Sequence, residues 1–291
     1  MTDPLHPRVI LAALEQRARR RFGQHFLVDR GVVDRIVRGA RVASGDRVVE
    51  IGPGLGILTR ALVEAGAALT AVEIDRDLAD HLRTTFPSVT LVEGDAAKVD
   101  WGQVCPGTGW KVVANLPYNV GTTLTMQLIR RPSTFASVTV MLQREVVHRL
   151  CAEPGSRTYG ALSVEAQARA RVTYLMPVPP DRFHPPPKVD SAVIRLEPYP
   201  EPDLGGVPAA RFDQVVRAAF SQRRKTAHNA LGAVFGRDRV RDVLAELGVE
   251  PMARAEQLDL DTYRRLAARL VTGSDGDDPV DDQRYGSEEE G

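Results

Sequence analysis

The feature that most constrains the fold of this chain is a regular alternation of short apolar runs with helix-like segments. Apolar residues recur at helical spacing over 29–42, and similar helical patterns cover 58–65, 78–85 and 122–130. The apolar runs between them are typical of β-strands, and they cover 48–51, 69–74, 90–93, 110–114 and 137–142. Strands that alternate with helices form a parallel sheet with crossover helices. We therefore predict an α/β fold.

Two further strands are expected at 172–176 and 192–196. The prolines at 185–187 exclude a helix between them, so we expect a short hairpin-like return at the sheet edge. From about Tyr199 the pattern changes, because a Pro- and Gly-rich stretch is followed only by helical patterns, at 212–220, 240–247 and 263–270. These patterns predict a small all-α domain.

The domain boundaries follow from these changes of pattern. We predict an α/β domain over 1–199, which includes a basic helical lead-in over 1–42, and a helical domain over 200–272. Residues 273–291 are acidic and contain little that can be buried, so we expect this tail to be disordered.

Charge and cysteine content limit the possible partners and compartments. The formal net charge is zero, but the tail from 273 carries eight acidic residues and one basic residue, so residues 1–272 carry a net charge of +7. A basic body favours a polyanionic partner. The two cysteines, Cys105 and Cys151, have neither metal-binding nor redox spacing, which fits a reducing cytosol. The apolar run at 9–14 is too short for a signal peptide, and no stretch reaches transmembrane length.

Three consecutive strand ends carry residues suited to a nucleoside. The first strand continues into EIGPGLG (50–56), whose glycines at 52, 54 and 56 permit a sharp turn close to a ligand. Glu73 ends the second strand, where a carboxylate can accept hydrogen bonds from ribose hydroxyls, and Asp95 follows the third, where it can accept one from an adenine amino group. Neither a dinucleotide fingerprint nor a P-loop is present. The pattern fits an adenosine without phosphate, as in S-adenosylmethionine.

The fourth strand end carries NLPYN (115–119), which suits methyl transfer to an exocyclic amine of a base. The lone pair of such a nitrogen is delocalised into the ring, and acceptors aimed at its N–H groups free it for attack. The Asn115 side-chain oxygen and a backbone carbonyl of Leu116 or Pro117 can be these acceptors, and Pro117 fixes the turn. Tyr118 offers a ring face on which an extruded base can stack. This chemistry requires no catalytic His, Cys or metal.

Together these residues resemble the KsgA/RsmA family of small-subunit rRNA adenine dimethyltransferases, which is related to the Erm methylases and to mitochondrial transcription factor B proteins. The matching segments run in family order over roughly residues 20–270: RFGQHFLVD (21–29), VVEIGPGLGILTRAL (48–62), AVEID (71–75), EGDA (93–96), NLPYN (115–119), MLQREVVHRL (141–150), FHPPPKVDSAVIRL (183–196) and FSQRRKT (220–226).

The resemblance implies a Rossmann-like class I methyltransferase fold, with a seven-stranded, mostly parallel sheet that contains one antiparallel strand. It implies that S-adenosylmethionine donates methyl groups, leaving S-adenosylhomocysteine, to N6 of two adjacent adenines in the hairpin loop near the 3′ end of 16S rRNA. The partner would be 16S rRNA or the assembling small ribosomal subunit, in the cytoplasm. We expect a monomer that needs neither a metal nor a membrane.

The resemblance also assigns roles to individual residues. The implied donor-binding residues are His25, Leu27, Gly52, Gly54, Glu73, Asp95, Ala96 and Asn115. The segment 115–118 would surround the target amine, and Phe183 would be a second ring that stacks on the base. Many relatives carry Asn at the position of His25, and both side chains can form hydrogen bonds. The predicted RNA-binding residues are Arg223, Arg224 and Lys225, with a second basic group at Arg17, Arg19, Arg20 and Arg21.

Three other functions are compatible with parts of the pattern. An Erm-like methylase of 23S rRNA shares the adenine chemistry, but the FHPPPKVDSAV segment and the C-terminal helical region favour the small-subunit enzyme. An RNA-binding ribosome-assembly or transcription factor with incidental methylation would not need Glu73, Asp95 and the NLPY segment intact. A small-molecule methyltransferase is disfavoured by the basic body and the extra helical domain.

Overall fold

The structure, a computed structural model, describes residues 25–222 and 224–270, which divide into two compact units. The first unit contains the described residues up to His148 and also Ala170–Pro200, and the second contains the remainder. Residues 149–169 group with the C-terminal helices in this division, although the sequence pattern assigns them to the α/β domain.

Three features of the sequence analysis lie outside the described residues. They are most of the basic lead-in, the acidic tail and the first of the three predicted RNA-binding residues, Arg223.

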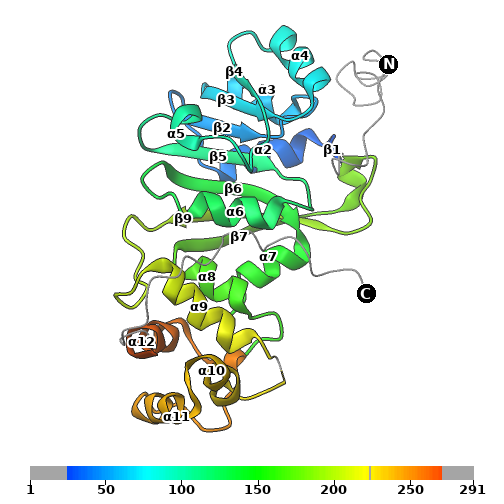
Figure 1. The fold of residues 1–291 in the computed structure, drawn as a ribbon. Helices are drawn as coiled ribbons and strands as arrows, with labels where there is room; N and C mark the ends of the chain where they lie inside the picture. Colours follow the sequence, from blue (N-terminus) through cyan, green and yellow to red (C-terminus); the bar gives the residue numbers. More distant parts are fainter. Residues whose placement is uncertain (1–24, 223, 271–291) are drawn as a thin grey trace. The chain divides into compact units, whose positions relative to one another are not determined.

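A seven-stranded sheet forms the centre of the first unit (Figure 1). Its strands, in spatial order, are β4 (Thr90–Glu93), β3 (Ala68–Glu73), β2 (Arg47–Ile51), β5 (Trp110–Asn115), β6 (Phe135–Gln143), β9 (Ser191–Pro198) and β7 (Ala170–Val178). Neighbouring strands from β4 to β6 are parallel, whereas β9 is antiparallel to both β6 and β7. The predicted α/β fold, with a mostly parallel sheet and one antiparallel strand, is confirmed.

The central strands are apolar because helices cover them. On β2, Val48, Val49 and Ile51 are all at most 3% exposed. Helices α2 (Arg30–Gly39) and α3 (Ile57–Glu64) contribute to one core cluster with residues of β2, β3, β5, β6 and β9. Strands buried on both faces have near-continuous apolar sequences, and this explains why their positions were predictable.

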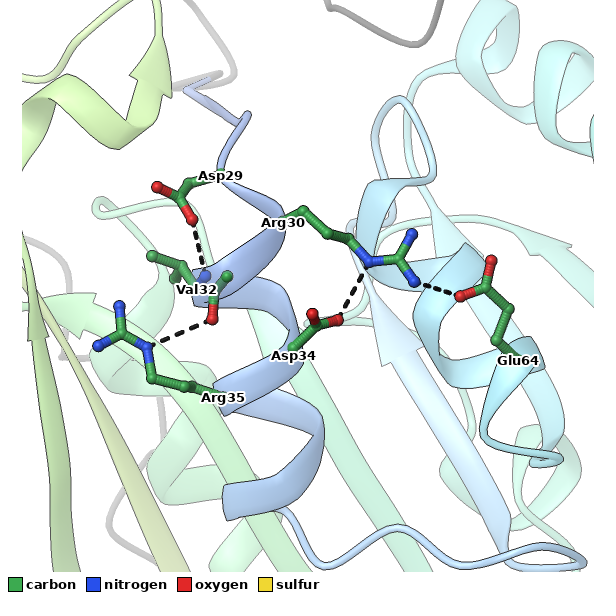
Figure 2. A network of polar contacts seen from close by, with 7 residues as sticks. Asp29, Arg30, Val32, Asp34, Arg35 and Glu64 are labelled. Carbon is green, nitrogen blue, oxygen red and sulfur yellow. Dashed lines mark hydrogen bonds and ion pairs between the residues drawn. The ribbon is translucent and has the colours of Figure 1, made fainter.

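Polar contacts fix the start of α2 and its place beside α3 (Figure 2). Asp29 caps the helix, because its Oδ1 accepts a hydrogen bond from the amide of Val32 at 2.9 Å. Arg30 forms ion pairs with Asp34, one turn further along α2, and with Glu64 at the end of α3. The cap is reinforced from a distant part of the chain, since Arg182 pairs with the other carboxylate oxygen of Asp29 at 2.6 Å.

Shorter elements complete the first unit. Strands β1 (Phe26–Leu27) and β8 (Phe183–His184) form a separate antiparallel ribbon, in which Leu27 pairs with Phe183. In Figure 1, α6 (Gly121–Ile129) lies in front of β6. The remaining helices are α4 (Arg76–Thr85), α5 (Trp101–Val104), α6 (Gly121–Ile129), the 3-10 helix η2 (Pro180–Arg182) and α7 (Arg144–Leu150), which ends at the start of the second unit.

The second unit is helical and has its own core. Phe212, Tyr263 and Leu266 are each 0% exposed within it, and the phenol of Tyr263 donates to the Ala255 carbonyl at 2.8 Å. A buried ion pair joins Arg169 to Asp213 at 2.6 Å. Its helices are α8 (Ala161–Gln167), α9 (Ala209–Phe220), α10 (Ala227–Phe235), α11 (Arg237–Glu246), η3 (Ala255–Gln257) and α12 (Leu260–Leu270). No helix within the described parts of the chain is long and apolar enough to cross a membrane.

Candidate active site

The carboxyl ends of β3, β2 and β5 lie side by side at one edge of the sheet, because these strands are parallel neighbours (Figure 1). A cavity opens at this edge and includes the residue pair of β1. Nine of the residues predicted from the sequence line it: His25, Leu27, Gly52, Gly54, Glu73, Asn115, Leu116, Pro117 and Tyr118. Ligands of open α/β sheets bind at this edge of the sheet.

The glycine-rich loop after β2 forms one wall of the cavity. Gly54 has a φ of +58°, a conformation that favours glycine. A Cβ atom at this residue would lie only 3.1 Å from the Phe26 ring, so the loop packs directly against β1. At Gly52, by contrast, a Cβ atom would meet only the Asn115 carbonyl oxygen, at 3.9 Å, so the backbone there is open to the cavity.

Glu73 projects into the cavity from the end of β3 and is 4% exposed. Its Oε1 accepts a hydrogen bond from the amide of Asp75 at 2.9 Å, and its Oε2 accepts one from the amide of Gly54 at 3.1 Å. Burial raises the pKa of this carboxyl despite these two bonds. Each carboxylate oxygen has a further lone pair, so the group can also accept bonds from ligand hydroxyls.

Glu50 is a second buried carboxyl group in the cavity, and the sequence analysis assigned it no role. It is 1% exposed, and the Thr59 hydroxyl donates to its Oε2 at 2.7 Å. Burial, and to a smaller extent the nearby charge of Glu73, raise the pKa of Glu50 to about 8. The sequence did contain a signal for Glu50, because it is an acidic residue inside the otherwise apolar strand VVEI. Acidic side chains are rarely buried unless they have a specific structural or functional role.

Asn115, the last residue of β5, is oriented by a hydrogen bond. Its Nδ2 donates to the backbone carbonyl of His25 at 3.2 Å. Because the amide nitrogen is engaged there, the side-chain oxygen is the atom left to accept hydrogen bonds from a ligand. The orientation agrees with the acceptor role predicted from the sequence, and it depends on β1 lying next to the end of β5.

The turn after Asn115 distinguishes the two candidate backbone acceptors. The Pro117 carbonyl already accepts the amide of Gly121 at 2.9 Å and that of Val120 at 3.3 Å, at the start of α6. The Leu116 side chain is buried, and its amide donates to the Met141 carbonyl on β6 at 3.3 Å. The Leu116 carbonyl is therefore the stronger of the two candidates.

The Tyr118 ring lies at the cavity and is held by two neighbours. Its hydroxyl is 2.6 Å from the hydroxyl of Ser191, at the start of β9. The His25 ring stacks beside it, with 5.8 Å between ring centroids and 27° between ring planes. Burial raises the pKa of the Tyr118 phenol, so the group stays neutral near pH 7.

Three predicted residues do not line this cavity. Asp95 accepts a hydrogen bond from the amide of Ala97 at 3.0 Å and forms an ion pair with Lys98 at 3.7 Å, so it stabilises its own turn. Ala96 is the next residue of that turn. Phe183 is 4% exposed and belongs to the core cluster that also contains Leu27. Phe183 is therefore packed in the core, and its stacking on the base stays a prediction.

Arg224 and Lys225, the two described members of the predicted RNA-binding group, are exposed between α9 and α10 of the second unit. Other cavity residues were missed by sequence reasoning, among them Phe26 and Ile74. Ile74 follows Glu73 and is 49% exposed, which is unusual for a large apolar residue beside a strand end. Within the described residues, no group of three or more His, Cys, Asp or Glu side chains is placed to hold a metal ion.

Comparison with known protein families gives one match that covers most of the chain. The family model of the ribosomal RNA adenine dimethylases matches residues 15–271. The chain is 48% identical over 266 residues to the ribosomal RNA small subunit methyltransferase A of Bordetella bronchiseptica, covering 89% of this chain and 97% of that relative. It is 45% identical to the protein of the same name from Thiobacillus denitrificans, covering 87% and 98%.

Two solved structures are similar in fold. A dimethyladenosine transferase from Plasmodium falciparum superposes with a TM-score of 0.69 at 26% identity, covering 83% of this chain and 96% of that one. The 23S rRNA methyltransferase ErmE superposes with a TM-score of 0.66 at 28% identity, covering 84% and 99%. Both similarities extend over nearly the whole length of the matched chains.

Proposed function

This chain belongs to the ribosomal RNA adenine dimethylase family and is a methyltransferase, and from this membership we propose that it dimethylates N6 of two adjacent adenines in the 3′-terminal hairpin loop of 16S rRNA. The proposed methyl donor is S-adenosylmethionine. Relatives at 43–48% identity are named ribosomal RNA small subunit methyltransferase A, which supports the small subunit as the source of the substrate. The reaction would occur where small ribosomal subunits assemble.

The structural observation that best supports the proposed chemistry is the orientation of Asn115. Its amide nitrogen is bonded to the His25 carbonyl at 3.2 Å, so its oxygen can meet an amine at the cavity. An acceptor at this place draws the amine N–H groups towards it and frees the nitrogen lone pair for attack. The Leu116 carbonyl can receive the second N–H, because the Pro117 carbonyl is engaged by α6.

The residues that line the cavity support the proposed donor. S-adenosylmethionine supplies a methyl carbon bonded to a positively charged sulfur, which an amine nitrogen can displace. Glu73 would accept hydrogen bonds from the ribose hydroxyls, and the bare backbone at Gly52 would admit the ligand close to the loop. Glu73 lines the cavity, and a positively charged donor bound there would favour the ionised form of its carboxyl group.

Tyr118 would supply the stacking face for the extruded adenine. Because the His25 ring stacks beside one face of the Tyr118 ring, the base would stack on the opposite face. Phe183 is buried in the core, so we assign the base contact to Tyr118 alone. Arg224 and Lys225 are proposed to bind RNA phosphates, because they are exposed cations in the second unit.

Methylation of 23S rRNA is the nearest alternative, since ErmE shares the fold. The identity to ErmE is 28%, whereas the small-subunit relatives reach 48%. The higher identity favours the small subunit.

The test uses labelled S-adenosylmethionine and ribosomal subunits that lack adenine dimethylation. We expect label to enter small subunits, and mass mapping to find two adjacent dimethyladenosines in the 3′-terminal hairpin of 16S rRNA. Large subunits are the matched control. Label in 23S rRNA with none in 16S rRNA would overturn the proposal.

The donor site is tested separately by Glu73→Ala. We expect the donor Kd to rise at least about tenfold, since the variant loses charge-assisted hydrogen bonds worth about 1.5–3 kcal/mol. Glu93→Ala, at the exposed end of β4, is the control. An unchanged dissociation constant in calorimetry would exclude the ribose role of Glu73.

A further inference from the structure

Two aromatic side chains of the cavity, His25 and Tyr118, are each held by the segment that leads into β9. The Nδ1 of His25 lies 2.8 Å from the carbonyl oxygen of Pro185, and the Tyr118 hydroxyl lies 2.6 Å from that of Ser191. A carbonyl can only accept, so Nδ1 carries the proton of the His25 ring. One short segment therefore orients both members of the stacked pair.

The direction of β9 explains why this segment reaches the cavity. Because β9 is antiparallel to β6, its first residue lies beside the last residues of the parallel strands. Ser191 pairs with Gln143 on β6, while Asn115 on β5 pairs with Met141 on the other side of β6. Tyr118 follows Asn115 by three residues and extends across the end of β6 to Ser191.

The hydroxyl of Ser191 is a rigid anchor. Its side chain is 0% exposed, and it lies in a strand that is paired on both sides. Leaving a buried hydroxyl without a hydrogen-bond partner costs free energy. The conformation in which the Tyr118 and Ser191 hydroxyls bond to each other is therefore favoured. The phenol ring of Tyr118 is therefore restricted in rotation and in displacement.

We propose that Ser191 is a positioning residue for methyl transfer, whose hydroxyl holds the Tyr118 ring so that a fixed face meets the target adenine. The role rests on the proposed function, because it presumes that a base stacks on Tyr118. A base that stacks on a fixed ring has its amine held in place relative to Asn115. Ser191 itself touches neither the base nor the donor.

A double-mutant cycle tests the role. Ser191→Ala and Tyr118→Phe each remove one partner of the same hydrogen bond. We expect each to lower kcat for small-subunit rRNA about three- to tenfold, the range of one net hydrogen bond, with the donor Kd unchanged in calorimetry. The double variant should be no slower than either single variant, because both changes remove the same bond. Multiplication of the two effects would overturn the proposal.

The matched control is Ser137→Ala on β6. Ser137 is 7% exposed, and its hydroxyl has no hydrogen-bond partner among the described residues. We expect wild-type kcat in this variant. Ser191→Thr keeps the hydroxyl and should retain at least half of the wild-type kcat. Equal losses in Ser137→Ala and Ser191→Ala would show that any buried hydroxyl of the sheet matters equally, which contradicts a positioning role.

The contact between the Tyr118 and Ser191 hydroxyls can also be tested without RNA. Fluorotyrosine can be incorporated at the six tyrosines, and Tyr118→Phe identifies the fluorine resonance of residue 118. We expect Ser191→Ala to shift that resonance and Ser137→Ala to leave it in place. An unmoved resonance in Ser191→Ala would contradict the anchoring of the ring.

Separate measurements test the proposed function and the positioning role of Ser191. Absence of transfer by the wild-type protein would count against the proposed function, whereas the fluorine shift would still report the contact. Equal kcat in the wild type and in Ser191→Ala, with transfer to small subunits intact, would overturn the positioning role alone.

Discussion

At the scale of single residues, the catalytic geometry depends on which atom of Asn115 faces the cavity. The amide nitrogen and oxygen have similar size but opposite hydrogen-bonding roles. The bond from Nδ2 to the His25 carbonyl settles the choice, because it uses the donor end of the group. The backbone oxygen of His25 thus orients the Asn115 side chain, whose acceptor role in methyl transfer is our proposal.

Asn115→Ala should abolish methyl transfer, lowering the single-turnover rate at least about a hundredfold, the scale of one lost preorganised group in a catalytic site. Donor binding should weaken only moderately, because the glycine loop and Glu73 are unchanged. Rapid-quench assays and calorimetry measure the two quantities. Near-normal turnover in this variant would contradict the mechanism.

The raised pKa of Glu50 makes stability depend on pH. The native carboxyl keeps its proton up to about pH 8, whereas the exposed group in the unfolded chain loses it near pH 4.5. The unfolded state therefore binds fewer protons in this interval, and the free energy of unfolding falls as pH rises. The slope from this group is at most about 1.4 kcal/mol per pH unit, and the decline ends above pH 8.

The glutamine side chain of the Glu50→Gln variant is neutral at every pH. The free energy of unfolding of this variant should therefore lack the part of the decline with pH that Glu50 causes. Urea unfolding at pH 5 and pH 8 measures it: relative to wild type, the variant should gain stability at pH 8. Glu201→Gln, at an exposed residue, is the control. Parallel pH profiles for wild type and Glu50→Gln would show that the native Glu50 is ionised.

At the scale of elements, the ribbon of β1 and β8 joins the site to distant parts of the chain. Leu27 and Phe183 pair across it and enter the same core cluster. The Phe26 ring of β1 lies against Gly54, while Pro185, just after β8, holds the His25 ring. A ribbon of two residue pairs thus connects the glycine loop, the Asn115 turn and the segment before β9.

Substitutions at Phe183 distinguish a role of this side chain in core packing from a role in base stacking. Phe183→Ala should lower the free energy of unfolding by about 3–5 kcal/mol, because it leaves a cavity in the core. Phe183→Leu fills most of that space, so we expect a smaller loss and methyl transfer close to wild type. Chemical unfolding and methyl-transfer assays measure the two effects. A stable Phe183→Leu protein that loses most of its methyl transfer would show that the ring stacks on the base.

Most of the longer elements were predictable from sequence and most of the shortest were not, although the nine-residue helix α10 was also missed. Buried strands such as β2 and β6 have continuous apolar runs, and α4 repeats its apolar residues at helical spacing. Strands β1 and β8 have two residues each, which is too short for any periodicity. Helices α7 and α8, of seven residues each, were missed for the same reason.

The site was predictable where motif residues end strands, as with Glu73 and Asn115. Contacts between distant segments were not, because no local pattern links Tyr118 to Ser191 or His25 to Pro185. Asp95 and Phe183 are suited to a ligand in sequence, but the structure shows one in its own turn and the other in the core.

At the scale of the whole molecule, charge should govern RNA binding. Residues 1–272 carry a net charge of +7, and 16S rRNA is a polyanion. Contacts with phosphates release counterions, so affinity falls with salt in proportion to the number of phosphates neutralised.

The double variant Arg224→Ala with Lys225→Ala should bind a 3′-terminal 16S hairpin more weakly and reduce the slope of log K against log salt by about 1–2. Fluorescence anisotropy at several salt concentrations measures this slope. The control is Arg83→Ala with Arg241→Ala, which removes two arginines already paired with carboxylates. Equal slopes in wild type and the first variant would exclude these two residues as phosphate contacts.

The place of β9 between β6 and β7 has a consequence for synthesis of the protein. Strand β7 leaves the ribosome before β9, yet β9 is its sole neighbour in the sheet as described. A growing chain that has not reached residue 198 therefore exposes unpaired edges on both β6 and β7. A fragment released before residue 198 would lack β9 and keep both edges exposed, so it would be prone to aggregation.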